Sequence, residues 1–186
     1  MPNYFGKNAA YLASGALAAA LFLTPAPAAA GDGPAFSIPA VAAPVPPKLD
    51  GTLDDPVWQT AAHVQLKWDF TYRRPATEAT DAYLLVDAKY LYVAFVAKQS
   101  ETITATQHTD NIPLGSDDVV RVYLFPGGDQ GFEYYFVANP LGTRYQASTE
   151  NAAFSPRWDA VSTTGAGGYI VTERIPLDDV VHFDRW

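Results

Sequence analysis

The chain has 186 residues, of which 48% are hydrophobic and 17% are charged, and it contains no cysteine. The length suits one domain, and the lack of cysteine excludes disulfides, thiolate metal sites and a cysteine nucleophile. Twenty acidic residues against twelve basic ones give a formal net charge of -8, which repels phosphate backbones and argues against nucleic acid as a partner.

Residues 1–30 have the pattern of a secretory signal peptide. Lys7 supplies positive charge, residues 9–23 form an uncharged apolar run, and small residues precede Gly31. The run is short for a stable membrane span, which needs about 20 residues, although an uncleaved anchor is the alternative. We expect cleavage between Ala30 and Gly31 and no membrane span in the mature chain. Export without cysteines indicates a bacterial protein that is periplasmic, outer-membrane-associated or extracellular.

Residues 31–47 are rich in proline and alanine and predict an extended linker. Within it, residues 36–41 are expected to pair as an edge strand, because proline restricts pairing to edges. Residues 49–58 begin with the turn pair Asp50-Gly51. We expect Asp54 to cap a short helical turn that follows it, with Trp58 facing inward.

The remaining chain predicts short strands separated by turns. They are expected at residues 64–72, 82–86, 91–98, 119–125, 132–139, 143–148 and 169–175. Residues 151–164 have the composition of a loop, and pairing of the fourth and fifth strands would bring Arg121 opposite Glu133. No part of the mature chain shows sustained helical periodicity. The pattern predicts an all-β, immunoglobulin-like antiparallel β-sandwich.

Several segments, in this order, resemble the family 9 carbohydrate-binding modules. They are Leu49-Asp50-Gly51-Thr52-Leu53-Asp54-Asp55-Pro56-Val57-Trp58, Leu91-Tyr92-Val93-Ala94-Phe95, Ser116-Asp117-Asp118-Val119-Val120-Arg121-Val122-Tyr123-Leu124, Phe136-Val137-Ala138-Asn139-Pro140-Leu141-Gly142, Trp158-Asp159-Ala160, and Gly168-Tyr169-Ile170-Val171 leading to Ile175-Pro176-Leu177. The resemblance is closer still to the family-9-like domain at the front of larger bacterial envelope proteins. It assigns residues 48–186 to one sandwich of this DOMON-like type.

The resemblance implies a sandwich in which two tryptophans clamp a terminal sugar ring while polar side chains bind its hydroxyls. It also implies that calcium can be bound. The chain departs from the family at the clamp, because residues 112–115 contain no aromatic residue and the second clamp would lie beyond Trp186. Thr172 stands where the family has glutamate, and Glu173 comes one residue later. We therefore expect a domain that is incomplete at its C-terminus, from a longer gene product or with an open sheet edge.

The candidate binding residues follow from residue type and position. The carbohydrate candidates are Trp158, Asp118, Asn139 and Arg121, and Asp117 is the candidate calcium ligand. Each has a structural alternative: a lid over the sheet for Trp158, turn formation for the acidic and amide residues, and a surface ion pair for Arg121. Trp68 is expected either to pack or to form an exposed platform.

Catalysis is not expected. Neighbouring acids such as Asp117-Asp118 and Asp178-Asp179 would point to opposite faces of a strand and could not flank one glycosidic bond. The three histidines lack zinc-site spacing, and no nucleophile elbow is present. We predict a non-catalytic module that binds an oligo- or polysaccharide, needs no cofactor, and is joined to further domains beyond Trp186, where any glycoside hydrolase part would lie. One alternative is a structural or interaction domain without a sugar site. Another is a haem-binding relative, in which Met and His usually ligate the iron, although Met1 is the only methionine of this chain.

Overall fold

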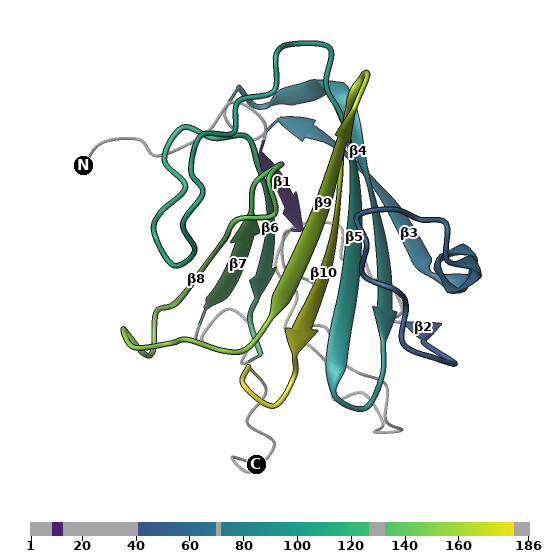
Figure 1. The fold of residues 1–186 in the computed structure, drawn as a ribbon, viewed down its shortest axis with the longest axis vertical. Coiled ribbons are helices and arrows are strands. Elements are labelled where there is room, and N and C mark those ends of the chain that lie inside the picture. The colour runs from purple at the N-terminus through teal and green to yellow at the C-terminus, as the bar shows by residue number, and fades with distance from the viewer. Residues whose placement is uncertain (1–8, 13–40, 70–71, 127–132, 181–186) are drawn as a thin grey trace.

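The computed structural model describes residues 9–12, 41–69, 72–126 and 133–180, which form two β-sheets packed face to face (Figure 1). One sheet has the order β1–β6–β7–β8: β1 (Ala9–Leu12), β6 (Val119–Leu124), β7 (Tyr134–Ala138) and β8 (Arg144–Ser148). The other has the order β2–β4–β5–β10–β9, with β3 also on β4: β2 (Val41–Ala42), β3 (Ala62–Asp69), β4 (Arg74–Val86), β5 (Tyr90–Lys98), β9 (Asp159–Gly165) and β10 (Gly168–Pro176). The predicted all-β sandwich is confirmed.

The main core lies between the two sheets, because alternate side chains of each central strand point inward. Phe95 of β5 and Val171 of β10 meet Val122 of β6 and Phe136 of β7 there, and all four are at most 1% exposed. These residues occupy the inward positions that apolar alternation predicts.

A second, smaller core covers the outer face of β4 and β5. The short 3-10 helix η1 (Pro56–Thr60) presses Trp58 against Leu85 and Tyr92. Trp58 is buried, as expected, but the helix cap is Asp55 rather than Asp54. The Asp55 side chain accepts a hydrogen bond from the backbone N–H of Val57 at 3.1 Å, which satisfies one of the free donors at a helix start.

Three further local predictions are wrong. Residues 159–165, expected in a loop, form the edge strand β9, which pairs along β10. Strand β4 begins at Arg74, well before the expected start at residue 82. In the β6–β7 pair Arg121 lies opposite Val137, not Glu133, because the hairpin turn sets the register and the alternation pattern does not.

Part of the expected leader falls within the described residues. Strand β1 pairs in parallel with β6, with Ala9 opposite Val119. The expected cleavage position, Ala30-Gly31, and most of the expected linker lie outside the described residues. None of the helices in the described part of the chain has the length and apolar character that crossing a membrane requires.

Candidate functional site

Asn139 and Asp117, two of the predicted site residues, are bonded to each other inside the molecule. The Asn139 Nδ2 atom donates to Asp117 Oδ2 at 2.8 Å and to the carbonyl of Gln107 at 2.9 Å. Its Oδ1 atom accepts from the backbone N–H groups of Leu141 and Thr143 at 3.0 and 2.9 Å. An amide side chain offers two donor and two acceptor positions. All four are therefore in use, and Asn139 ties the end of β7 to the loop before β6.

The hydrogen-bond positions of the Asp117 carboxylate are also all in use. Its Oδ1 accepts from the backbone N–H and the hydroxyl of Thr106, both at 2.8 Å, and its Oδ2 accepts from the N–H of Gln107 at 3.0 Å as well as from Asn139. A carboxylate has about four lone-pair positions, so Asp117 does not fit a calcium ligand. The part of the chain that the structure describes contains no group of three or more acidic or histidine side chains suited to a metal ion.

These bonds also govern the charge of Asp117. Burial acts to raise the pKa of Asp117, but the hydrogen bonds from Gln107, Asn139 and Thr106 outweigh it, so the pKa lies below its ordinary value. The neighbouring Asp118 is buried too, and its Oδ2 accepts from Gln99 Nε2 at 2.8 Å and from the N–H of Thr104 at 2.7 Å. The two aspartates thus fasten residues 99–107 to the start of β6.

Trp158 lies apart from this network, directly before β9. It is 3% exposed, its indole N–H donates to Gln146 Oε1 at 2.8 Å, and its ring meets Phe136 edge to face with centroids 5.2 Å apart. The guanidinium of Arg144 lies over the ring at 5.9 Å from the centroid. Both its polar group and its ring have protein partners in this arrangement, and a role of Trp158 in binding sugar stays a prediction.

Arg121 lies on the outer face of the four-stranded sheet, away from the other candidates. Its Nη1 donates to the Tyr123 hydroxyl at 3.5 Å, and its Nε is buried with no partner among the described residues. The structure therefore brings Asp117, Asp118 and Asn139 together and keeps Trp158 and Arg121 separate from them.

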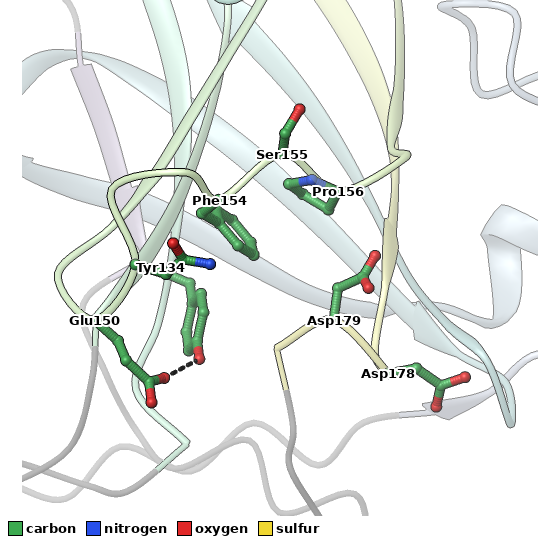
Figure 2. Close-up of a pocket in the computed structure, with 8 residues that line it drawn as sticks. Tyr134, Glu150, Phe154, Ser155, Pro156, Asp178 and Asp179 are labelled. Atoms are coloured by element: carbon green, nitrogen blue, oxygen red, sulfur yellow. Dashed lines mark hydrogen bonds between the residues drawn. The ribbon is translucent and has the colours of Figure 1, made fainter.

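A pocket of about 500 Å³ opens at one end of the sandwich, between the loop after β8 and the turn after β10 (Figure 2). This volume falls in the range of small-molecule sites, about 300–1,000 Å³. The lining residues are Tyr134, Glu150, Asn151, Phe154, Ser155, Pro156, Asp178 and Asp179. We call this cavity the end pocket.

One wall of the end pocket is aromatic. The rings of Tyr134 and Phe154 lie side by side with centroids 5.0 Å apart and an interplanar angle of 58°, and the Tyr134 hydroxyl donates to Glu150 Oε2 at 2.8 Å (Figure 2). The loop is shaped by Asn151, whose carbonyl accepts from the N–H of Phe154 at 3.0 Å and whose Oδ1 accepts from the N–H of Ala153 at 2.9 Å. This turn holds Phe154 against the core.

The opposite wall carries carboxylates. The backbone of Leu177 donates to the carbonyl of Lys89 at 2.8 Å, and Leu177 and Val180 are both buried. Because these two residues anchor the turn after β10, the residues between them, Asp178 and Asp179, stay exposed at the pocket (Figure 2). The pair belongs to a turn and not to a strand, contrary to our expectation.

Sequence reasoning did not select the end pocket. Its aromatic and acidic members come from three separate segments, and no spacing pattern connects them. The sequence shows Phe154 as an aromatic residue in a polar loop and Asp178-Asp179 as an acidic pair after a strand. These residues form a candidate site only because the fold brings them together at one end of the sandwich. The arrangement offers ring surface on one side and oxygen acceptors on the other.

Comparison with known proteins identifies a family and several similar structures, of which two are described here. The family model described as carbohydrate family 9 binding domain-like matches residues 49–184. Two solved structures of a carbohydrate binding module family 9 from Caldicellulosiruptor kristjanssonii are similar in fold. The complex with cellotriose has 15% identity and a TM-score of 0.51 and covers 74% of this chain and 66% of that one. The complex with glucose has 16% identity and a TM-score of 0.52 and covers 74% and 68%.

This chain thus spans about two thirds of the length of the two matched modules. At their level of identity, the likeness concerns the fold. No curated protein matches the chain by sequence.

Proposed function

Because the chain belongs to the carbohydrate family 9 binding domain-like family, we propose that it is a non-catalytic module that binds a saccharide, and that the end pocket is the binding site. The observation that carries the proposal is the half-buried ring of Phe154, packed on the buried ring of Tyr134, in one cavity with oxygen-rich side chains. Two modules of similar fold are complexes with cellotriose and with glucose.

The chemistry of the end pocket suits a sugar ring. A pyranose presents C–H groups that pack on aromatic rings, and hydroxyls that need several fixed hydrogen-bond partners. Phe154, which is half-buried, offers the first kind of surface, and Tyr134, which is 3% exposed, packs against its ring. Glu150, Asp178 and Asp179 offer acceptors for the second. Three carboxylates repel an acidic sugar, so the proposed ligand is a neutral saccharide or an amino sugar.

Binding without hydrolysis is the proposed activity. Glycoside hydrolysis requires two carboxyl groups about 5–10 Å apart on either side of the scissile bond. Asp178 and Asp179 are neighbours in a single turn, and Glu150 accepts the hydroxyl hydrogen bond of Tyr134 (Figure 2). This arrangement supports a role for the acids in holding hydroxyl groups.

The cellular setting is also part of the proposal. The leader pattern of residues 1–30 supports export to the periplasm, the outer membrane or the exterior of a bacterium. The family resemblance to the front domains of envelope proteins supports further domains of the same protein as partners, including a glycan-degrading part.

A second candidate is a structural or interaction domain that keeps the sandwich and lacks a sugar site. The observation that favours it is Trp158, whose ring is 3% exposed and packed on Phe136. An aromatic residue that packs in the core is not available for stacking on a sugar.

Isothermal titration calorimetry with glucose, cellotriose, xylotriose and chitotriose tests the proposal. We expect saturable binding to at least one of them. Asp179→Asn and Phe154→Ala should each weaken it by about tenfold, the loss that corresponds to one contact of about 1.4 kcal/mol. Asp54→Asn, an exposed aspartate outside the pocket, serves as the matched control and should bind as the wild type does. Absence of heat with all four sugars, with the protein folded, would favour the structural domain.

A further inference from the structure

The outer face of the four-stranded sheet carries a row of aromatic rings, where the outer face of an antiparallel sheet is ordinarily polar. Tyr123 lies on β6 and Phe125 directly after it, Tyr135 lies on β7, and Tyr145 lies on β8. These four positions alternate with the core positions of the same strands, so their side chains point away from the other sheet. All four are half-buried and thus partly open to solvent. We call this surface the tyrosine face.

Ring contacts connect the members of the tyrosine face. Tyr123 lies opposite Tyr135 in the register of β6 and β7, and their ring centroids are 5.8 Å apart. The Tyr135 ring is 6.0 Å from that of Tyr145, and the Tyr123 ring is 6.4 Å from that of Phe125. On the inner side, the row rests on a small buried cluster that consists of Leu114, Val119 and Val137. The rings therefore form one continuous surface.

A cation and an anion lie at the two ends of this row. Arg121 lies opposite Val137, and its Nη1 atom donates to the Tyr123 hydroxyl at 3.5 Å. Glu133 comes two positions before Tyr135 on the chain and therefore lies on the same face of the sheet. The charge of Glu133 is among the causes, after burial, that raise the pKa of Tyr135 to about 12. The central pair of tyrosines thus separates Arg121 from Glu133.

Neither of the two charges is matched within the described part of the chain. The register places Arg121 opposite Val137, which is about 13 Å of strand away from Glu133. Among the described residues, no ion pair involves Arg121 or Glu133. The Nε atom of Arg121 is also buried without a hydrogen-bond acceptor, which costs stability. The tyrosine face thus presents two opposite charges that another molecule can pair with.

The arrangement of these charges is complementary to itself. Along the strands, the pair of Tyr123 and Tyr135 lies midway between the levels of Arg121 and Glu133. A half-turn about an axis that crosses the strands at this pair exchanges the two ends of the face. Two copies stacked in this way bring Arg121 of each copy to the level of Glu133 of the other. Self-complementarity of this kind is what a two-fold symmetric interface requires.

We propose that the tyrosine face is the interface of a homodimer, in which Arg121 of each copy pairs with Glu133 of the other and the tyrosine rings meet at the centre. Tyrosine and arginine are enriched in protein interfaces, which commonly have an apolar centre and a polar rim. Two sheets that stack face to face keep their strands within about 30° of each other, and the half-turn described above satisfies this condition. This inference goes beyond saccharide binding.

A polysaccharide is the competing occupant, because sugar rings also pack on aromatic side chains. The two charges favour a second copy. A neutral sugar would leave both Arg121 and Glu133 without an ionic partner. An acidic sugar would match Arg121 but would be repelled by Glu133, and an amino sugar would meet the reverse difficulty. A second copy of the chain matches both charges at once.

Sedimentation velocity of the full chain over a range of concentrations tests the proposal. We expect a reversible equilibrium between monomer and dimer that shifts toward monomer with added salt. Arg121→Glu and Glu133→Arg should each raise the dissociation constant at least about tenfold, because each variant places like charges together twice. An equimolar mixture of these two variants should form a heterodimer, since one copy then carries two acids and the other two arginines. The double variant Arg121→Glu/Glu133→Arg should dimerise by itself.

Matched controls make the same changes of charge elsewhere. Lys89→Glu and Glu101→Arg alter exposed positions outside the tyrosine face and should leave the equilibrium unchanged. Tyr135→Ala should weaken the dimer, because it removes a ring at the centre. If Arg121→Glu does not fold, Glu133→Arg and Glu133→Gln decide, and the arginine should weaken the dimer more than the glutamine.

Three results would overturn the proposal. The first is a wild type that stays monomeric at every concentration, and the second is a dimer that both charge reversals leave intact, which would place the interface on another surface. The third is a mixture of the two folded variants that stays monomeric. A monomeric wild type whose binding to insoluble cellulose falls in Tyr135→Ala would assign the tyrosine face to a polysaccharide.

Discussion

The backbone N–H of Gly51 donates to the hydroxyl of Thr172 at 3.0 Å, across 121 positions of sequence. The same glycine accepts, through its carbonyl, a bond from the Thr163 hydroxyl at 2.6 Å. Gly51 thus fixes the loop before η1 onto the neighbouring strands β9 and β10. Its φ of +71° is a conformation that favours glycine.

Gly51→Ala should destabilise the fold by about 3 kcal/mol or more. A Cβ atom at this position would lie 2.7 Å from the carbonyl carbon of Ser162 and 2.8 Å from the nitrogen of Thr163, both backbone atoms that cannot move aside. Gly115→Ala is the matched control, because Gly115 also has a positive φ but nothing lies within 4 Å of its Cβ position. Gly115→Ala should lower the free energy of unfolding by only about 1 kcal/mol, the cost of placing an alanine in a backbone conformation with positive φ. Urea unfolding measures both, and equal losses would exclude close approach as the cause.

Asn139→Ala should lower the free energy of unfolding by about 2–4 kcal/mol. The substitution removes four hydrogen bonds and deprives buried groups of a partner, among them the Asp117 carboxylate, which loses one of its four donors. Asn151→Ala, an exposed asparagine that also holds a turn, should lose less than about 1 kcal/mol. Chemical unfolding followed by tryptophan fluorescence measures the difference, and similar losses for the two variants would contradict a central role for Asn139.

The Asp117 network predicts a loss of stability in acid. Because the pKa of Asp117 is lowered in the folded chain from an ordinary value of 3.8, the unfolded chain binds more protons just below that value. The contribution of Asp117 is therefore present above its ordinary pKa and is lost as pH falls through the folded pKa. Asp117→Asn should be less stable at pH 7 and should lose less further stability than the wild type on acidification. Unfolding curves at a series of pH values test this, and parallel pH profiles would refute it.

The buried carboxylate of Glu173 should give stability the opposite dependence on pH. Its side chain is fully buried on the inner face of β10, between Val171 and Ile175, and neither carboxylate oxygen has a partner among the described residues. Burial raises the pKa of Glu173 well above its ordinary value of 4.5. Above pH 4.5 the folded chain therefore holds a proton that the unfolded chain releases, so stability falls as pH rises toward the folded pKa.

Glu173→Leu should remove this dependence and stabilise the protein by about 1–3 kcal/mol at pH 8, with a smaller gain at pH 5. Glu101→Leu replaces an exposed glutamate and should show no such pH-dependent gain. Thermal unfolding by circular dichroism at the two pH values compares them. A gain of the same size at both pH values would mean that Glu173 does not titrate differently on folding.

The sequence predicts the central strands and the sandwich because apolar side chains alternate there. Phe95, Val122 and Phe136 are recognisable as inward residues from their neighbours alone. The edge strand β9 escapes this reasoning, since Asp159–Gly165 is a half-exposed run of small and polar residues. Its strand structure depends on pairing with β10, which local sequence does not contain.

The site is less predictable than the fold for a related reason. Asp117 and Asn139 are polar residues at strand ends, where such residues can bind a ligand or form internal hydrogen bonds. The structure shows that the loop of residues 99–107 packs against them and that they form internal bonds. The end pocket needs Phe154 and Asp179 to meet from opposite sides of a cavity. Contacts of this kind depend on tertiary packing and not on spacing.

The position of β10 has a consequence for biosynthesis. This strand follows all the other described strands in the chain, yet it lies between β5 and β9 inside its sheet and not at an edge. Until it arrives, β5 lacks one neighbour, the inter-sheet core lacks part of one wall, and Gly51 lacks its bond to Thr172. Such long-range closure is slow, so a nascent chain stays largely unfolded until β10 has been synthesised.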